Sequence, residues 1–279
     1  MLTYHLITLF PESTESYLNA SILKRAEKKG LIAIKYYNPR DFTISAKKGA
    51  KQTYAERRVD DRPYGGGPGM VIEAMPVIKA IEAALLRSSL STLLKLQRTS
   101  RSELRRAGKI RNTKSEIFSN LRSVESNGRN KSENLNKKSK KTASKIKIIF
   151  FSPSGKQFTN VMAESFKKYT DIVFICGRYE GIDARVKKAF PMIDISVGPY
   201  VLTGGELPAM IMIDTITRRI PGVLGDNTSI EEGRIASPDV YTRPAIIEYR
   251  KKKYRVPKVL LGGHHAKMEE WKMAKKHRK

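Results

Sequence analysis

Residues 175–210 read ICGRYEGIDARVKKAFPMIDISVGPYVLTGGELPAM, and this stretch decides the fold class. Apolar runs at 171–176 and 192–197 have the length of buried strands, and each leads directly into a loop rich in glycine, tyrosine and glutamate. An open α/β sheet binds its ligands outside the carboxyl ends of its strands. The stretch therefore predicts an α/β fold whose binding site is formed by these loops.

Outward from this stretch, segments with strand and helix periodicity alternate along the chain. Apolar runs and helical spacing favour strands at 4–10, 31–37 and 146–151 and helices at 16–29, 70–86, 161–169, 184–190 and 206–219. Such alternation is typical of a mostly parallel sheet covered by helices on both faces. We therefore predict one α/β domain over residues 1–224.

The charge of the chain is strongly positive and unevenly distributed. The formal net charge is +27 for 279 residues, and segments 87–145 and 245–279 carry most of it. An excess of this size indicates a polyanionic partner, with nucleic acid as the first candidate and an anionic membrane surface as the second.

Two segments interrupt the α/β pattern. Residues 87–145 are rich in Ser, Lys, Arg and Asn and nearly free of aromatic residues, which predicts a disordered basic insertion. Residues 225–240 are polar and are predicted to be an interdomain linker. Residues 241–279 then form a short basic domain, with strands or turns followed by a helix at 266–277.

The compartment is indicated by what the sequence lacks. Cys176 is the only cysteine, so no intramolecular disulfide can form, and a reducing compartment is favoured. The first residues have neither the basic region nor the cleavage site of a signal peptide. No apolar run reaches the roughly 18 residues of a membrane span. We expect a cytoplasmic protein with no membrane association.

Three strand-to-loop junctions carry the glycines that a ligand site requires. They are FSPSG at 151–155, CGRYEG at 176–181 and VGPYVLTGGE at 197–206. Glycines here expose backbone N–H and C=O groups that can bond the edge of an adenine, while apolar side chains supply walls. One such loop alone is typical of a plain turn, but three at neighbouring strand ends favour a shared binding site.

A fourth glycine-rich segment, RRVDDRPYGGGPGMV at 57–71, precedes the helix predicted at 70–86. It completes neither G-x-G-x-x-G nor a phosphate loop ending in G-K-[S/T]. Two interpretations stay open: a tight loop needed only for packing, or a flexible wall of the active site flanked by the charges of Asp60, Asp61 and Arg62.

Seven motifs in order, RPYGGGPGM, SPSG, CGRYEGID, VGPYVLTGGELPAM, IPGVLG, YTRP and LLGGHHAKMEEW, closely resemble the bacterial tRNA (guanine-N1)-methyltransferase (TrmD) family of the SPOUT class. The resemblance covers nearly the whole chain except 87–145. It implies a SPOUT-type, mostly parallel sheet with a C-terminal trefoil knot, and a small, mainly helical C-terminal domain. It also implies a homodimer whose active site lies at the subunit interface.

The resemblance further implies S-adenosylmethionine as the methyl donor. Its pocket carries over to Phe151, Ser152, Pro153, Gly177, Glu180, Val197, Gly198, Pro199, Tyr200, Val201, Leu202, Gly204, Gly205 and Pro208. Many relatives have an acidic residue where Pro199 stands, so a side-chain carboxylate contact is not expected there. No metal site is predicted, because the adjacent His264 and His265 point in different directions, and a requirement for Mg²⁺ is not readable from the sequence.

The implied reaction is methylation of N1 of the guanine at position 37 of tRNA. Because N1 carries a proton, the site needs a general base near N1 and a cation near O6. Arg218 matches the family arginine at O6; otherwise it is a surface residue at a helix end. The linker lacks the family aspartate, which leaves Glu232 or Glu231 as the base, with Asp239 more distant, unless both glutamates are only solvated linker charges.

The tRNA itself is expected to contact both domains. The predicted substrate-binding residues are Asp61, Arg62, Tyr64, Gly65, Gly66, Gly67, Tyr241, Arg243, Lys251, Lys252 and Lys253. Two rival functions stay open: a SPOUT methyltransferase acting on another RNA, and a catalytically impaired RNA-binding protein, which the altered linker would permit.

Overall fold

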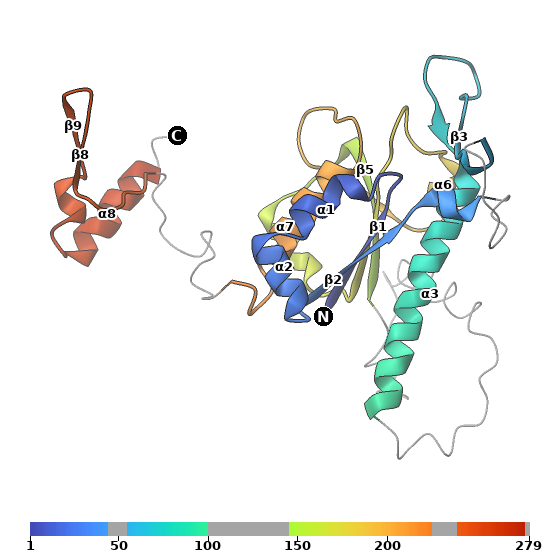
Figure 1. Ribbon diagram of the computed structural model, residues 1–279, viewed down its shortest axis with the longest axis horizontal. Coiled ribbons are helices and arrows are strands. Elements are labelled where there is room, and N and C mark those ends of the chain that lie inside the picture. Colours follow the sequence, from blue (N-terminus) through green and yellow to red (C-terminus); the bar gives the residue numbers. More distant parts are fainter. Residues whose placement is uncertain (44–54, 100–144, 225–238, 277–279) are drawn as a thin grey trace, which may run out of the picture. The chain divides into compact units, whose positions relative to one another are not determined.

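The computed structural model describes residues 1–43, 55–99, 145–224 and 239–276. The chain divides into two compact units, Met1–Val223 and Leu224–Lys279 (Figure 1). The predicted linker bases, Glu231 and Glu232, lie outside the described residues.

A five-stranded sheet in the order β2-β1-β6-β5-β7 organises the first unit, and every neighbouring pair is parallel. The strands are β1 Leu2–Ile7, β2 Ile32–Tyr37, β5 Ile146–Gln157, β6 Asp171–Ile175 and β7 Ile193–Ser196. The predicted parallel α/β fold is confirmed. The threading of the expected trefoil knot stays a prediction.

Helices cover both faces of this sheet (Figure 1). They are α1 Glu12–Leu18, α2 Ser21–Lys28, α3 Ala74–Thr99, α5 Asn160–Phe166, α6 Arg185–Ala189 and α7 Glu206–Thr217. The shorter elements are the 3₁₀ turns η1 Pro39–Phe42 and η2 Ala55–Arg57 and the strands β3 Asp60–Asp61 and β4 Val71–Ile72.

Alternation along the strands produces two separate cores. Tyr4 and Leu6 of β1 pack in one hydrophobic cluster with residues of α1, α2, α5 and α7, whereas Ile7 packs in the other with residues of α3 and α6. In β6, Phe174 belongs to the first cluster and Ile175 to the second. Successive strand side chains point to opposite faces, so near-continuous apolar runs are buried on both sides, as parallel sheets require.

Two predicted helices differ from the structure. The helix predicted at 16–29 is two helices, because the backbone at Ala20 is extended and Ser21 has a φ of 44°. The helix predicted at 70–86 begins at Ala74 and continues to Thr99, so residues 87–99 are helical and not part of a disordered insertion. Pro76 falls in the first turn of α3, where a missing N–H costs no hydrogen bond. Residues 100–144 lie outside the described residues.

The second unit contains an antiparallel hairpin, β8 Ile246–Tyr249 and β9 Lys252–Arg255, followed by η6 Lys258–Leu260 and α8 His265–Lys276. The strands or turns and the terminal helix predicted for this segment thus have structural counterparts. Among the described residues of both units, no helix combines the length and apolar character of a membrane span.

Candidate active site

A cavity of about 520 Å³ lies where the first unit's central strands end, and all three predicted strand-to-loop junctions line it. Phe151 and Pro153 lie within β5, which continues through the predicted loop at 151–155 to Gln157. Gly177 and Glu180 follow β6, and Leu202 follows β7. These junctions come from the adjacent strands β6, β5 and β7, whose parallel pairing brings their carboxyl ends together. The sequence thus predicted correctly which loops meet.

The predicted cofactor residues line this cavity with two exceptions, Gly198 and Pro199. Gly198 makes room for the Tyr200 ring instead, since a Cβ at position 198 would lie 2.2 Å from that ring. The Tyr200 hydroxyl donates to the Val197 carbonyl at 3.3 Å, which folds its ring back over Gly198. Pro199 is exposed.

Gly205 brings the third junction into contact with the second. Its N–H donates to the Gly177 carbonyl at 3.0 Å. A Cβ at position 205 would lie 2.5 Å from Cys176 Cα, a distance that requires the backbone to move. Only glycine therefore permits this approach of the two loops at the cavity floor.

We expect the Gly205→Ala substitution to separate these two loops, with a cost to stability of about 1–3 kcal/mol, as for other overpacked sites. Urea unfolding of the full chain measures it. Gly177→Ala is the matched control for stability, since its Cβ would lie 3.5 Å from Ile182 Cγ1, an ordinary contact. Equal unfolding midpoints for wild type and Gly205→Ala would contradict the close approach.

Gly155 permits a similarly close approach of the first junction to the strand β7. A Cβ there would lie 2.6 Å from the Ile195 backbone nitrogen. The register of β5 against β7 shifts between Phe151 and Lys156, so β5 bulges at this point. A bulge bends its strand and redirects nearby side chains, and here it brings Ser152 and Pro153 to the cavity.

An ion pair between Arg178, which lines the cavity, and Glu206, which does not, was not foreseen in the sequence. Arg178 Nε lies 3.0 Å from Glu206 Oε2, and the Glu206 side chain is only 4% exposed. The other carboxylate oxygen accepts a hydrogen bond from Thr8 Oγ1 at 2.7 Å. This arrangement joins the loop after β1, the CGRYEG junction and the first turn of α7. Two features of the sequence could have indicated this pair: the charged Arg178 directly after Gly177, and the acidic Glu206 as the first residue of an otherwise apolar helix.

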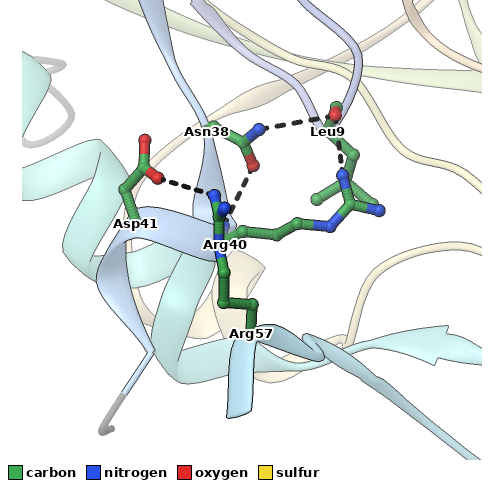
Figure 2. Close-up of polar contacts among 5 residues, drawn as sticks. All are labelled: Leu9, Asn38, Arg40, Asp41 and Arg57. Atoms are coloured by element: carbon green, nitrogen blue, oxygen red, sulfur yellow. Dashed lines mark hydrogen bonds and ion pairs between the residues drawn. The ribbon is translucent and has the colours of Figure 1, made fainter. Parts of the chain in front are cut away.

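The Arg178 guanidinium also packs on Phe10, with Cζ 4.9 Å from the ring centroid, and Arg40 contacts the same ring at 5.3 Å. Arg40 Nη1 donates to the Leu9 carbonyl at 2.9 Å, and Asn38 Nδ2 donates to the same oxygen at 3.4 Å. Figure 2 shows the two hydrogen bonds to the Leu9 carbonyl and the nearby ion pair of Arg57 with Asp41 at 3.3 Å. The loop after β1 is thereby held against the cavity wall.

Cys176 is buried and directly precedes Gly177 of the cavity lining. Burial raises the pKa of its thiol well above the usual value, and the nearby Glu206 charge raises it further, while Arg178 opposes this. Thiol chemistry depends on the thiolate, so Cys176 is a packing residue and not a nucleophile.

The glycine-rich segment at 57–71 supports the cavity from outside. Glu180 N–H donates to the Met70 carbonyl and Ile72 N–H to the Gly181 carbonyl, both at 3.0 Å. Gly69 approaches the Glu180 side chain so closely that a Cβ would lie 2.6 Å from its Cγ. This half of the segment therefore fixes the second junction.

The other half of that segment is exposed. None of the predicted substrate residues here lines the cavity, namely Asp61, Arg62, Tyr64, Gly65, Gly66 and Gly67. Tyr64 is fully exposed. The three glycines all have positive φ, a conformation that side chains rarely adopt, so they make a surface loop beside the cavity wall.

Arg218 lies outside the cavity lining, at the carboxyl end of α7. Its N–H donates to the Asp214 carbonyl at 3.1 Å. Burial raises the pKa of the Asp214 carboxyl, and the Arg218 charge opposes that rise. A cation at this helix end is favourable in itself, so the position is compatible with both interpretations of this arginine.

The predicted tRNA contacts of the second unit are all exposed: Tyr241, Arg243, Lys251, Lys252 and Lys253. The Tyr241 and Trp271 rings lie 6.3 Å apart, in agreement with a packing role for Trp271. In the part of the chain that the structure describes, no group of three or more His, Cys, Asp or Glu side chains could hold a metal ion.

Comparison with known proteins identifies the family. Residues 2–115 and 130–279 match the model described as tRNA (Guanine-1)-methyltransferase TrmD. The chain is 36% identical over 275 residues to the tRNA (guanine-N(1)-)-methyltransferase of Lachnoclostridium phytofermentans, covering 97% of this chain and 85% of that one. For the enzyme of the same name from Clostridioides difficile, identity is 35% over 273 residues, covering 96% and 90%.

A solved structure of a tRNA methyltransferase has a similar fold. The crystal structure of tRNA (m1G37) methyltransferase from Aquifex aeolicus matches with a TM-score of 0.60 and 28% identity, covering 99% of this chain and 89% of that one. The family match, the identities along the chain and the shared fold lead to one conclusion: the chain belongs to the tRNA (guanine-1)-methyltransferase family.

Proposed function

We propose that this protein transfers a methyl group from S-adenosylmethionine to N1 of the guanine at position 37 of tRNA. The observation that carries the proposal is the convergence of three glycine-containing loops on one cavity, in a chain of this family. We expect a cytoplasmic homodimer in which the partner subunit completes each site.

The cavity suits a nucleoside with a short charged tail. Its volume of about 520 Å³ lies within the usual range for small-molecule sites. Phe151, Val197 and Leu202 supply apolar walls, and the glycines at 177, 204 and 205 line the cavity without a side chain. These residues would hold the methyl donor, whose sulfonium supplies an already electrophilic methyl group.

The remaining work of the protein is to position the guanine and move one proton. N1 becomes nucleophilic when its proton is removed, and negative charge then develops on O6. Arg218 would stabilise that charge, and Glu232 or Glu231 would accept the proton. The target base must leave its stack to reach a protein pocket, as for other enzymes that act on bases.

The direct test is methyl transfer to tRNA transcripts that carry guanine or adenine at position 37, followed by mass spectrometric mapping of the methylated atom. We expect 1-methylguanine with the first transcript and no product with the second. Methylation of a ribose 2′-oxygen or of another RNA would favour a different SPOUT activity, and binding without any transfer would favour the catalytically impaired protein.

Replacing the linker glutamates tests the assignment of the base. We expect Glu232→Gln or Glu231→Gln to lower the rate of the methyl-transfer step by about 10²-fold, the lower end for a general base because the adjacent carboxylate substitutes in part. Single-turnover kinetics across pH 6–9 measures the effect, with Glu248→Gln in the second unit as the control. Unchanged rates in both linker variants would exclude these glutamates.

A further inference from the structure

The hairpin β8–β9 presents a face on which only Lys252 has been given a role so far, as a predicted tRNA contact. Every residue of both strands is exposed, and Figure 1 shows the hairpin projecting beyond α8 within the second unit. Ile247 pairs with Tyr254 and Tyr249 with Lys252. Residues directly opposite in an antiparallel pair share a face, so these four side chains form one surface, the Tyr249–Tyr254 face.

The Tyr249–Tyr254 face combines large apolar area with positive charge. Ile247, Tyr249 and Tyr254 are 56%, 59% and 46% exposed. Lys252 Nζ lies 5.6 Å from the centroid of the Tyr254 ring, and Arg250 Cζ lies 5.2 Å from that of Tyr249. Both rings are therefore accessible and each has a cation beside it.

Physical chemistry indicates that such a face has a partner. A two-stranded hairpin is marginally stable by itself in water, and contiguous exposed apolar groups on a soluble unit mark interaction sites. The charge indicates which kind of partner. Residues 246–255, IIEYRKKKYR, contain five cations and one acid, so the same basic face of a second copy would be repelled and a polyanionic partner is favoured.

We propose that the Tyr249–Tyr254 face binds unpaired nucleotides of an RNA, with the tyrosine rings stacked on bases and Lys252 at an adjacent phosphate. Aromatic rings interleaved with cations are the usual platform for single-stranded nucleic acid, because every base offers a π face. Identifying that RNA as the tRNA substrate rests on the proposed function; the stacking face itself does not.

The test compares two RNAs with equal numbers of phosphates, an anticodon stem-loop and a fully paired duplex, binding to the full-length protein by fluorescence anisotropy. We expect Tyr254→Leu to weaken stem-loop binding about tenfold, within the range for loss of one stacked base. Duplex binding should stay near the wild-type value. Tyr249→Leu should act in the same direction and gives an independent reading if one variant misfolds.

Matched variants separate stacking from other effects. Tyr254→Phe keeps the ring and should bind the stem-loop like wild type, whereas Lys252→Gln should weaken both RNAs and lower the salt slope by about one. Tyr17→Leu, at an exposed tyrosine of the first unit, should change neither affinity. Circular dichroism checks that each variant is folded.

Three results would overturn the proposal. Wild-type stem-loop affinity in folded Tyr254→Leu and Tyr249→Leu would show that the face does not touch RNA. Equal losses on stem-loop and duplex would exclude stacking on unpaired bases. A lower oligomeric mass of these variants in light scattering would make the face a protein interface. Methyl transfer is assayed in parallel, so that its absence alongside loop-selective binding would reject the proposed function and leave this inference standing.

Discussion

The Arg178→Met variant will be less stable than wild type by about 3–5 kcal/mol, the range for removing one partner of a buried ion pair. Glu206 is 4% exposed, and without Arg178 its carboxylate keeps only the Thr8 hydroxyl among the contacts described above. Methionine fills a similar volume, so the loss comes from the uncompensated charge and not from a cavity. Urea unfolding monitored by circular dichroism measures the difference.

Two further variants test whether the loss of stability comes from the buried charge of Glu206. Arg178→Met combined with Glu206→Gln should recover part of the stability, because the buried charge is removed together with its partner. Arg185→Met breaks the Arg185–Asp183 pair at 2.6 Å, whose arginine side chain is 70% exposed, and should change stability by less than about 1 kcal/mol. Similar losses at Arg178 and Arg185 would contradict a buried role for the Arg178–Glu206 pair.

The Arg218→Ala variant will lower kcat by about 10²–10³-fold, the range for removal of one group that stabilises a developing oxyanion. The KM for S-adenosylmethionine should stay close to wild type, because Arg218 does not line the cavity. Steady-state kinetics with tRNA and the methyl donor varied separately measures both quantities. The expectation rests on the proposed charge on guanine O6.

Arg185→Ala is the control for this experiment, since it removes an equally charged but exposed arginine from the same unit. A merely structural Arg218 would shift the unfolding midpoint and leave the kcat of the folded fraction unchanged. A fall in kcat of less than about threefold in the folded Arg218→Ala protein would remove this residue from the catalytic proposal.

The sequence predicted the parts of the fold that depend on local patterns. The apolar run at 171–176 predicted a buried strand, and in the structure β6 is a strand whose residues are all buried. The glycines at 177, 204 and 205 indicated the cavity because a backbone that approaches a ligand or another loop needs glycine. Strand ends in a parallel sheet then fix which loops meet.

Long-range features were harder to foresee. The Arg178–Glu206–Thr8 arrangement joins residues nearly 200 positions apart, and nothing in the local sequence of Thr8 indicates its carboxylate partner. The true length of α3 was missed because Ser-rich composition at 87–91 favours a loop, while a helix can continue where its preceding turns are packed. Gly198 lies outside the cavity lining, and its neighbour Tyr200 occupies the space a side chain would need; its assignment to the methyl donor stays a prediction.

The most direct test of the account is calorimetric titration of S-adenosylmethionine into the full-length protein. We predict measurable binding heat for wild type, and weaker affinity for folded Gly205→Ala, because its second and third loops no longer meet at the cavity floor. No heat for the folded wild-type protein at any temperature tested would contradict the claim that these loops hold the methyl donor.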